Sequence, residues 1–298
     1  MTEEGTLEHR GHRVWWGRAG GASTSRSVPV LTIHGGPSLC HDYLEPLAGL
    51  AAERPVYFYD QYGCGRSDRA GDPEEYDIEL FVDELAAVRA ALGLDKVHLY
   101  AHSYGGALLL EYMLQRKPAG VLSLTLSNTF ASVRDLDDGW DRRLAELSPG
   151  RGDALRAGPD VDEEAWDVAL QEFVTRFVLA GAAPPECLAR SQQHLGEEVY
   201  YRMHGPSWFQ PTGRWSTWDA SSRLGTMEVP ALVVGGTLDQ CPPDLAEKLA
   251  SGIPGAQLVV LEAGHLPFYE SPEDYLDLIG DFLVRADAPG RAGALAQP

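Results

Sequence analysis

Short apolar runs alternate along the chain with longer stretches in which apolar residues recur every three or four positions. The short runs are rich in β-branched and aromatic residues and end in Gly, Ser or Asn, which is typical of buried strands. These runs occupy residues 28–36, 54–63, 95–103, 121–128, 229–236 and 256–264. The helical stretches between them are residues 79–92, 104–116 and 243–252. Alternating strands and helices predict the α/β class, with a mostly parallel sheet covered by helices on both faces.

This alternation stops between about Asn128 and Leu224, where amphipathic helix patterns follow one another without a strand pattern. The patterns lie in "WDRRLAEL", "EEAWDVALQEFVTRFVLAG" and "PPECLARSQQHLGEEVYYRM". A helical insertion in a parallel α/β chain is best interpreted as a cap over the carboxyl edge of the sheet, where open sheets of this kind bind ligands. We therefore expect residues 1–128 and 225–298 to form the core and residues 129–224 to form a helical cap.

Composition narrows the class of protein. With 298 residues, 44% of them hydrophobic, the chain can bury one large α/β core with an inserted segment. A net charge of -20 argues against nucleic acids and anionic membranes as partners, and no apolar run approaches the ~20 residues of a membrane helix. The polar N-terminus does not resemble a signal peptide, and the four scattered cysteines suit a reducing compartment, so we expect a cytoplasmic protein. No feature of the sequence indicates an oligomeric state.

One strand-to-helix corner carries a candidate nucleophile. In "AHSYGG", residues 101–106, Ser103 lies on a tight turn between small residues, where an expected strand meets an expected helix. This small-x-Ser-x-Gly pattern is typical of a nucleophile elbow, which exposes the serine hydroxyl at a helix N-terminus. Ala101 stands where the pattern usually has glycine. Taken alone, the same residues would also fit an ordinary capping serine.

Two further strand-ending loops supply the partners that a nucleophilic serine needs. Asp239 follows the fifth expected strand, and His265 follows the sixth. Either residue alone would also fit an ordinary turn or surface loop. The order Ser, Asp, His, with the helical insertion between the first two, is however the order of the catalytic triad in α/β-hydrolases. The backbone N–H groups of Tyr104 and of Gly36 in "HGGP" are the expected oxyanion donors.

Five stretches together resemble the prolyl iminopeptidase family of serine peptidases: "HGGPSLCHDYL", "YDQYGCGRSD", "HSYGGALLLEY", "HGPSWF" and "LDQCPP". The resemblance covers most of the chain, from about residue 28 to residue 283. It implies an α/β-hydrolase fold with a helical cap, and cleavage of an N-terminal residue from short peptides or amides without a cofactor or metal. On this resemblance, Ser103, Asp239 and His265 match the family's nucleophile, acid and base, and Gly36 and Tyr104 match its oxyanion donors.

One departure from the family concerns the free amine of the substrate. In the family two glutamates bind this amine, and the matching positions here hold Trp208 and Gln240, which we expect to contact the substrate. An ammonium without a counter-charge in a partly dry pocket is unfavourable by several kcal/mol. Glu197, Glu198 or Asp138 could supply a carboxylate instead.

Three functions therefore stay open at this point. The chain could be an exopeptidase or amidase acting on aminoacyl groups of short peptides, a hydrolase of small-molecule amides, esters or lactones without a free amine, or a non-catalytic ligand-binding relative. The complete set of triad residues argues against the third function, and the missing glutamates shift the balance from the first towards the second. An aromatic cluster that could form either cap core or a wall over the site comprises Trp208, Phe209, Trp215 and Trp218.

Overall fold

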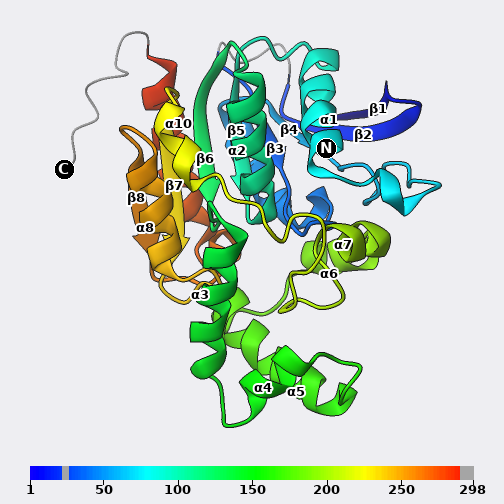
Figure 1. Cartoon of the computed structure of the whole chain (residues 1–298). Coiled ribbons are helices and arrows are strands. Elements are labelled where there is room, and N and C mark those ends of the chain that lie inside the picture. The colour runs from blue at the N-terminus through cyan, green and yellow to red at the C-terminus, as the bar shows by residue number, and fades with distance from the viewer. Residues whose placement is uncertain (22–26, 289–298) are drawn as a thin grey trace.

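A computed structural model describes residues 1–21 and 27–288. Across these residues one eight-stranded sheet forms the centre, in the order β1-β2-β4-β3-β5-β6-β7-β8. Strands β3 to β8 are parallel, whereas β2 is antiparallel to both of its neighbours. The strands are β1 (Glu3–His9), β2 (His12–Ala19), β3 (Val30–Ile33), β4 (Val56–Tyr59), β5 (Val97–His102), β6 (Val121–Ser127), β7 (Ala231–Gly236) and β8 (Gln257–Leu261). The predicted α/β class with a mostly parallel sheet is confirmed (Figure 1).

The N-terminal hairpin of β1 and β2 is the part of the sheet that the sequence did not predict. β1 lies at the edge of the sheet, and its residues alternate between exposed and half-buried, so they form no apolar run. Arg10 and Gly11 connect the two strands with φ angles of 49° and 82°. Positive φ at both positions is what a tight two-residue hairpin turn requires, and glycine adopts it without strain.

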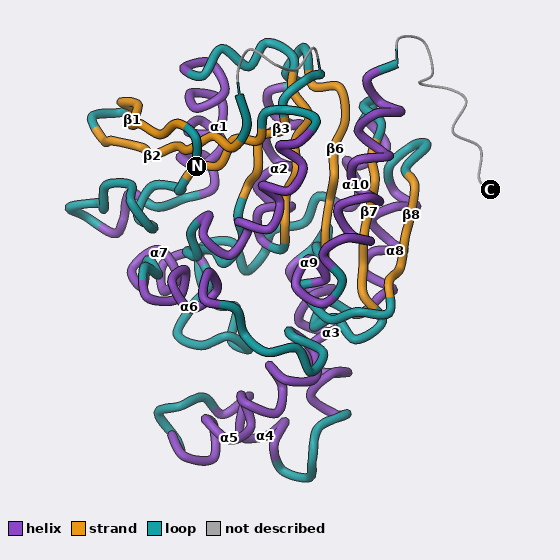
Figure 2. Tube along the Cα trace, turned by 180° about the vertical axis from the view of Figure 1, so that it is seen from behind, coloured by secondary structure: helices purple, strands orange, loops and turns teal. Residues whose placement is uncertain are grey.

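Helices cover both faces of the sheet. α1 (Ile78–Ala91), α2 (Tyr104–Arg116) and α8 (Pro243–Gly252) pack on one face, with α1 and α2 in front of the strands in Figure 1. The 3-10 helix η1 (His41–Ala52) and α10 (Pro272–Asp287) pack on the opposite face, and α10 lies towards the viewer in Figure 2. Two short helices in loops are η2 (Pro73–Glu75) and α9 (Pro267–Glu270).

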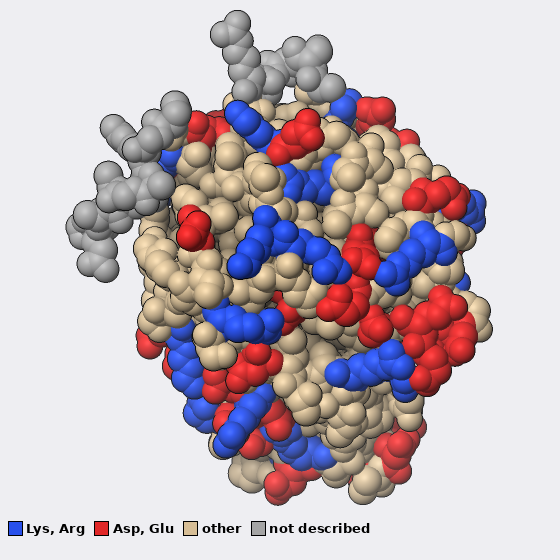
Figure 3. All heavy atoms as spheres, turned by 45° about the horizontal axis from the view of Figure 1, so that its top comes forward, with Lys and Arg blue, Asp and Glu red and all other residues tan. Residues whose placement is uncertain are grey.

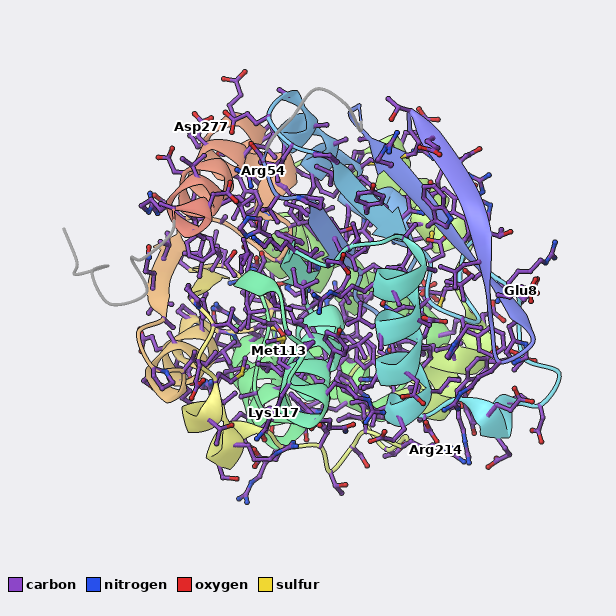
Figure 4. All side chains as sticks on the ribbon, turned by 90° about the horizontal axis from the view of Figure 1, so that it is seen from above. Glu8, Arg54, Met113, Lys117, Arg214 and Asp277 are labelled. Carbon is purple, nitrogen blue, oxygen red and sulfur yellow. The ribbon has the colours of Figure 1, made fainter. Side chains whose placement is uncertain are left out.

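Two buried residues, Arg54 and His98, attach the end of α10 to the sheet. Arg54, which is 2% exposed, donates from Nη1 to Asp287 Oδ2 at 3.1 Å and to Val28 O at 3.2 Å. His98 Nε2 lies 3.0 Å from the other carboxylate oxygen of Asp287. Figure 4 labels Arg54 beside this helix. The last described helix is therefore held by one residue just before β4 and one within β5.

Between β6 and β7, where every residue is described, the chain forms helices and loops and no strand of the sheet, as the sequence predicts. α4 and α5 lie beyond the carboxyl ends of the strands (Figure 1). The helix η4 crosses residue 224, and the domain limits of 1–128, 129–224 and 225–298 stay a prediction. The helices of this segment are α3 (Val133–Ala145), α4 (Arg151–Ala157), α5 (Glu163–Phe173), the π-helix η3 (Val174–Val178), α6 (Glu186–Gln193), α7 (Glu197–Met203) and η4 (Ser221–Thr226).

Three further observations concern the surface charges, the helices and the cysteines. On the face shown in Figure 3, Lys and Arg side chains are interspersed with Asp and Glu side chains, as on an ordinary solvated surface. Among the described helices, none has the length and apolar character that crossing a membrane requires. All four cysteines are free thiols, in line with their scattered positions in the sequence.

Candidate active site

The corner between β5 and α2 has the geometry of a nucleophile elbow. Ser103 adopts φ 56° and ψ −129°, a backbone conformation that residues other than glycine rarely adopt, and α2 begins at the next residue. Two bonds hold this strained turn: Ser103 N donates to Ser127 O at 3.0 Å, and Thr129 Oγ1 donates to Ser103 O at 2.7 Å. The turn thus places the half-buried serine at the N-terminus of a buried helix, whose dipole favours negative charge there.

The two glycines after Tyr104 allow α2 to pack against the neighbouring strands. A Cβ atom on Gly105 would lie 2.4 Å from Ile33 O, and one on Gly106 would lie 2.2 Å from Thr129 Oγ1. Both distances are too short for carbon, so any larger residue would push the helix away from β3 or from the loop after β6. The elbow sequence is therefore fixed by packing as well as by the turn.

Asp239 and His265 come from the loops after β7 and β8 and are hydrogen-bonded to each other. His265 Nδ1 lies 2.7 Å from Asp239 Oδ1, and Asp239 is fully buried. Asp239 Oδ1 also accepts from Cys241 N at 2.9 Å, and its other oxygen accepts from Asn128 Nδ2 at 2.8 Å. Three donors thus stabilise the carboxylate, and the remaining nitrogen of His265 is left for another partner.

Two residues that sequence reasoning missed hold the acid in place. Asn128, at the end of β6 with φ 51°, contacts both Asp239 and Gly264 O through its amide nitrogen. Arg143 on α3 is 7% exposed and donates to Asp239 O at 2.8 Å and to Thr237 O at 2.7 Å. Asn128 directly follows β6 in "LTLSN". A polar residue at the end of a parallel strand is the sequence signal that could have placed Asn128 near Asp239.

Gly36 and Tyr104 present backbone N–H groups beside the elbow. Gly36 has φ 131°, and a Cβ there would lie 2.2 Å from Ser38 N, so only glycine fits. Tyr104 is the first residue of α2, where an N–H has no partner within the helix. Within the described ranges, neither N–H has a hydrogen-bond acceptor. Both donors are therefore free, as an oxyanion hole requires.

The "DQYG" stretch supports the loop that carries Gly36. Gln61 N donates to His34 Nε2 at 2.9 Å, and Gln61 Nε2 donates to His34 O at 2.8 Å. Burial lowers the pKa of His34 to about 4, so this imidazole is neutral and can accept at Nε2. Asp60 is fully buried and accepts from His41 N at 2.8 Å and from Arg66 N at 2.9 Å. This stretch thus acts as a scaffold for the loop that carries Gly36.

His102 connects the elbow to both other loops. Its Nε2 donates to His265 O at 2.8 Å, so its Nδ1 must accept, and Tyr43 OH donates to it at 3.0 Å. The same hydroxyl accepts from Gly35 N at 2.7 Å. Burial lowers the pKa of His102 well below its ordinary value, with the nearby His265 acting in the same direction. One neutral network therefore joins the loop that carries Gly36, the elbow and the loop that carries His265.

Ser103, His265, Gly36 and Tyr104 all line one cavity of about 390 Å³ between the core and the inserted helices. None of the residues that line it is Asp, Glu, Lys or Arg. The wall is mostly apolar and aromatic, and it includes Trp140, Trp166, Trp208 and Trp215. The cavity therefore combines the expected catalytic groups with an uncharged binding surface.

Trp208 and Gln240, distant in sequence, meet in this cavity. Trp208 Nε1 donates to Gln240 Oε1 at 3.0 Å. The carboxylates that could have replaced the missing glutamates are Glu197, Glu198 and Asp138; all three are exposed and lie outside the cavity lining.

Of the aromatic cluster, Trp208 and Trp215 line the cavity, whereas Phe209 and Trp218 are buried outside it. The cluster is therefore both cap core and wall of the site.

Two clusters of described residues outside the cavity have metal-ligand types within 4.8 Å of one another, and both include Asp42: Cys40, Asp42 and His194, and His41, Asp42 and Glu45. Asp42 accepts from Arg190 Nε at 3.1 Å and from Cys40 Sγ at 2.9 Å. The carboxylate is thus already paired with a guanidinium, which is a structural arrangement that disfavours a second cation.

The fold and the site together define a class of protein. A model of the alpha/beta hydrolase fold family matches residues 28–272. The chain belongs to this family, and it is a serine hydrolase.

Within the class, similarity to proline iminopeptidases extends over almost the whole chain. The proline iminopeptidase of Clostridioides difficile (strain 630) is 32% identical over 95% of this chain and 99% of its own length. That of Heyndrickxia coagulans is 35% identical, also over 95% of this chain and 99% of its own length. The resemblance noted in the sequence is confirmed: the chain belongs to the prolyl iminopeptidase family of serine peptidases.

Solved structures agree with this assignment. The crystal structure of a proline iminopeptidase from Mycobacterium smegmatis matches with a TM-score of 0.88 and 29% identity, over 96% of this chain and 99% of that one. The crystal structure of VinJ matches with a TM-score of 0.90 and 28% identity, over the same shares of the two chains. The α/β-hydrolase fold with inserted helices is therefore common to all three proteins.

Proposed function

We propose that Ser103, His265 and Asp239 form the catalytic triad of this hydrolase. His265 takes the proton of the Ser103 hydroxyl as the oxygen attacks the substrate carbonyl, and the N–H groups of Gly36 and Tyr104 bind the resulting oxyanion. His265 then gives the proton to the departing amine or alcohol, which leaves an acyl-enzyme. Water enters, gives its proton to His265 and attacks the acyl carbon, and the acid is released as Ser103 recovers its proton. Asp239 holds the imidazole in the required tautomer throughout.

The substrate that we propose is a small-molecule or short-peptide amide or ester whose acyl group carries no free amine. The observation that supports this choice is the cavity around Ser103, because no carboxylate lines it. A buried ammonium there would lose its hydration without gaining a counter-charge, and this penalty is several kcal/mol. A neutral acyl group would instead gain apolar contact with the indole rings of the wall.

A free-amine aminopeptidase is the second candidate. Both sequence relatives quoted above are named proline iminopeptidases, which favours this activity. It requires an ammonium to be bound by neutral oxygens alone, or by cation–π contact with rings such as Trp208. Catalysis would use the same triad, so only the choice of substrate separates the two candidates.

Two measurements test this proposal. A fluorophosphonate probe should label the protein at Ser103 only, and Ser103→Ala should abolish labelling while the circular dichroism spectrum stays unchanged. Values of kcat/KM should then be higher for N-blocked or apolar acyl esters than for prolyl or alanyl arylamides. Labelling that persists in Ser103→Ala would contradict the triad assignment. Efficient cleavage of the prolyl arylamide would contradict the neutral-substrate choice and leave the triad intact.

A further inference from the structure

The hydrogen bond between Trp208 and Gln240 fixes which way the Gln240 carboxamide points. An indole N–H can only donate, so its partner on Gln240 must be the amide oxygen and not the amide nitrogen. Gln240 is 6% exposed, and its side chain lines the cavity. The amide nitrogen has no acceptor among the described residues and is not sealed in the interior, so its N–H groups face the cavity.

The backbone places this amide beside the expected base. Phe177 O, in the π-helix η3, accepts from Gln240 N at 3.0 Å and from His265 N at 3.1 Å. One carbonyl oxygen thus holds both residues, and Val178 O binds the next residue of the base loop, Leu266, at 3.2 Å. Gln240 and His265 are thus neighbours on the wall of one cavity, and we expect a substrate group that contacts Gln240 to lie near the carbonyl that reacts.

From this geometry we infer that Trp208 and Gln240 form a donor subsite, which binds a neutral acceptor oxygen on the substrate and disfavours an ammonium at the same place. Two carboxylates would offer acceptors to a cation. The observed pair offers amide N–H groups, whose positive ends repel a cation and bind a hydroxyl, ether or carbonyl oxygen. This inference rests on the proposed function, and it narrows the substrate to an acyl group that carries such an oxygen near its carbonyl.

The inference is tested with three p-nitroanilides that share one acyl skeleton. The propionyl, lactoyl and alanyl compounds differ only in carrying hydrogen, hydroxyl or ammonium at the α-carbon. We expect kcat/KM in the order lactoyl, propionyl, alanyl. Trp208→Phe removes the indole donor and lets the Gln240 amide turn its oxygen to the cavity, so the lactoyl-to-alanyl ratio should fall about tenfold. Gln240→Glu should lower the same ratio further.

A matched control is Trp218→Phe. Trp218 Nε1 also donates to a buried side-chain acceptor, Glu111 Oε1 at 2.9 Å, but Trp218 does not line the cavity. This variant should therefore leave the lactoyl-to-alanyl ratio unchanged. If Trp218→Phe shifts the ratio as much as Trp208→Phe, the effect is general loosening of the cap and the inference is wrong.

A binding measurement separates this inference from the proposed function. In Ser103→Ala, lactamide should protect the protein against thermal unfolding more strongly than alaninamide, whether or not the enzyme turns over any of the anilides. Failure of Ser103 to react with the probe would overturn the proposed triad but not the subsite. Equal or stronger protection by alaninamide, or a lactoyl-to-alanyl ratio that Trp208→Phe and Gln240→Glu leave unchanged, would overturn the subsite alone.

Discussion

A buried glutamate on α1 should make the stability of this enzyme depend on pH. Glu84 is fully buried; its Oε2 accepts from Tyr62 N at 2.9 Å, and its Oε1 has no partner within the described ranges. Burial raises the pKa of Glu84 to about 8, the Tyr62 N–H partly offsets this, and the charge of Asp60 adds to it. Tyr59 and Cys64 lie nearby, and burial raises the pKa of each, so both stay neutral below pH 9. Glu84 is therefore protonated in the folded protein at neutral pH.

The stability of the fold should decrease as pH rises, because Glu84 binds its proton more tightly in the folded state than in the unfolded state. Because the folded pKa lies above the ordinary value of 4.5, the stability that protonated Glu84 contributes is fully present below pH 4.5 and is lost as pH rises through about 8. Over that window the loss amounts to about 5 kcal/mol, or about 1.4 kcal/mol for each pH unit. Glu84→Gln replaces the acid with a neutral side chain of similar shape. We expect the variant to match the parent near pH 5 and to exceed its stability progressively up to pH 8.5.

Urea unfolding of the two proteins between pH 5 and 8.5 measures this difference directly. The control is Glu111→Gln, because Glu111 is a buried glutamate on α2 whose pKa is lowered by its bonds to Arg223, against the effect of burial. That pair stabilises the fold above pH 4.5, so the control variant should be less stable than the parent at every pH tested. If the free energy of unfolding changes with pH in the same way for the parent and for Glu84→Gln, Glu84 is not the source of the pH dependence and this prediction is wrong.

Two predictions concern residues that position the proposed catalytic groups. Gln61→Ala leaves His34 O without its side-chain donor and loosens the loop that carries Gly36. We expect kcat to fall about ten- to hundredfold with KM nearly unchanged. An unchanged kcat would contradict a scaffolding role for Gln61. Asn128→Gly keeps the positive φ of that position but removes the donor to Asp239 Oδ2. Because one hydrogen bond to a charged group is worth about 1.5–3 kcal/mol, we expect kcat to fall about ten- to hundredfold. A pH–rate profile of Asn128→Gly identical to that of the parent in shape and height would show that Asp239 does not need this amide.

The parallel strands could be predicted because burial on both faces makes their sequences continuously apolar. β5 and β7 are buried along their whole length, and each lies inside a run that the pattern marks as a strand. β1 could not be predicted in this way, since only one of its faces is partly covered and its polar residues outnumber the apolar ones. Edge strands need a neighbour in space to be recognised, and β1 has only β2.

The positions of Ser103, Asp239 and His265 could be predicted because each lies in the connection that follows a parallel strand. Parallel strands end at one edge of the sheet, so residues that follow them come together whatever the sequence distance between them. The residues that hold these three side chains in place do not follow this rule. Arg143 reaches the acid loop from α3, and Tyr43 reaches the elbow from η1, so both contacts depend on how helices pack on the core. Only the folded chain shows them.

In this cavity the proposed catalytic residues can be recognised in the sequence, whereas the contact that we expect to set specificity cannot. The loss of two glutamates is visible in the sequence, but the bond between Trp208 and Gln240 joins residues 32 positions apart, one from the inserted segment and one from the core. A neutral residue at position 240 could offer its amide oxygen or its amide nitrogen to a substrate, with opposite preferences for an ammonium. The indole of Trp208 takes the oxygen, so the nitrogen is left for the ligand. If the proposed subsite is correct, a family member keeps the residues of the proposed triad and oxyanion hole while two substitutions reverse the polarity of the group that the pocket selects.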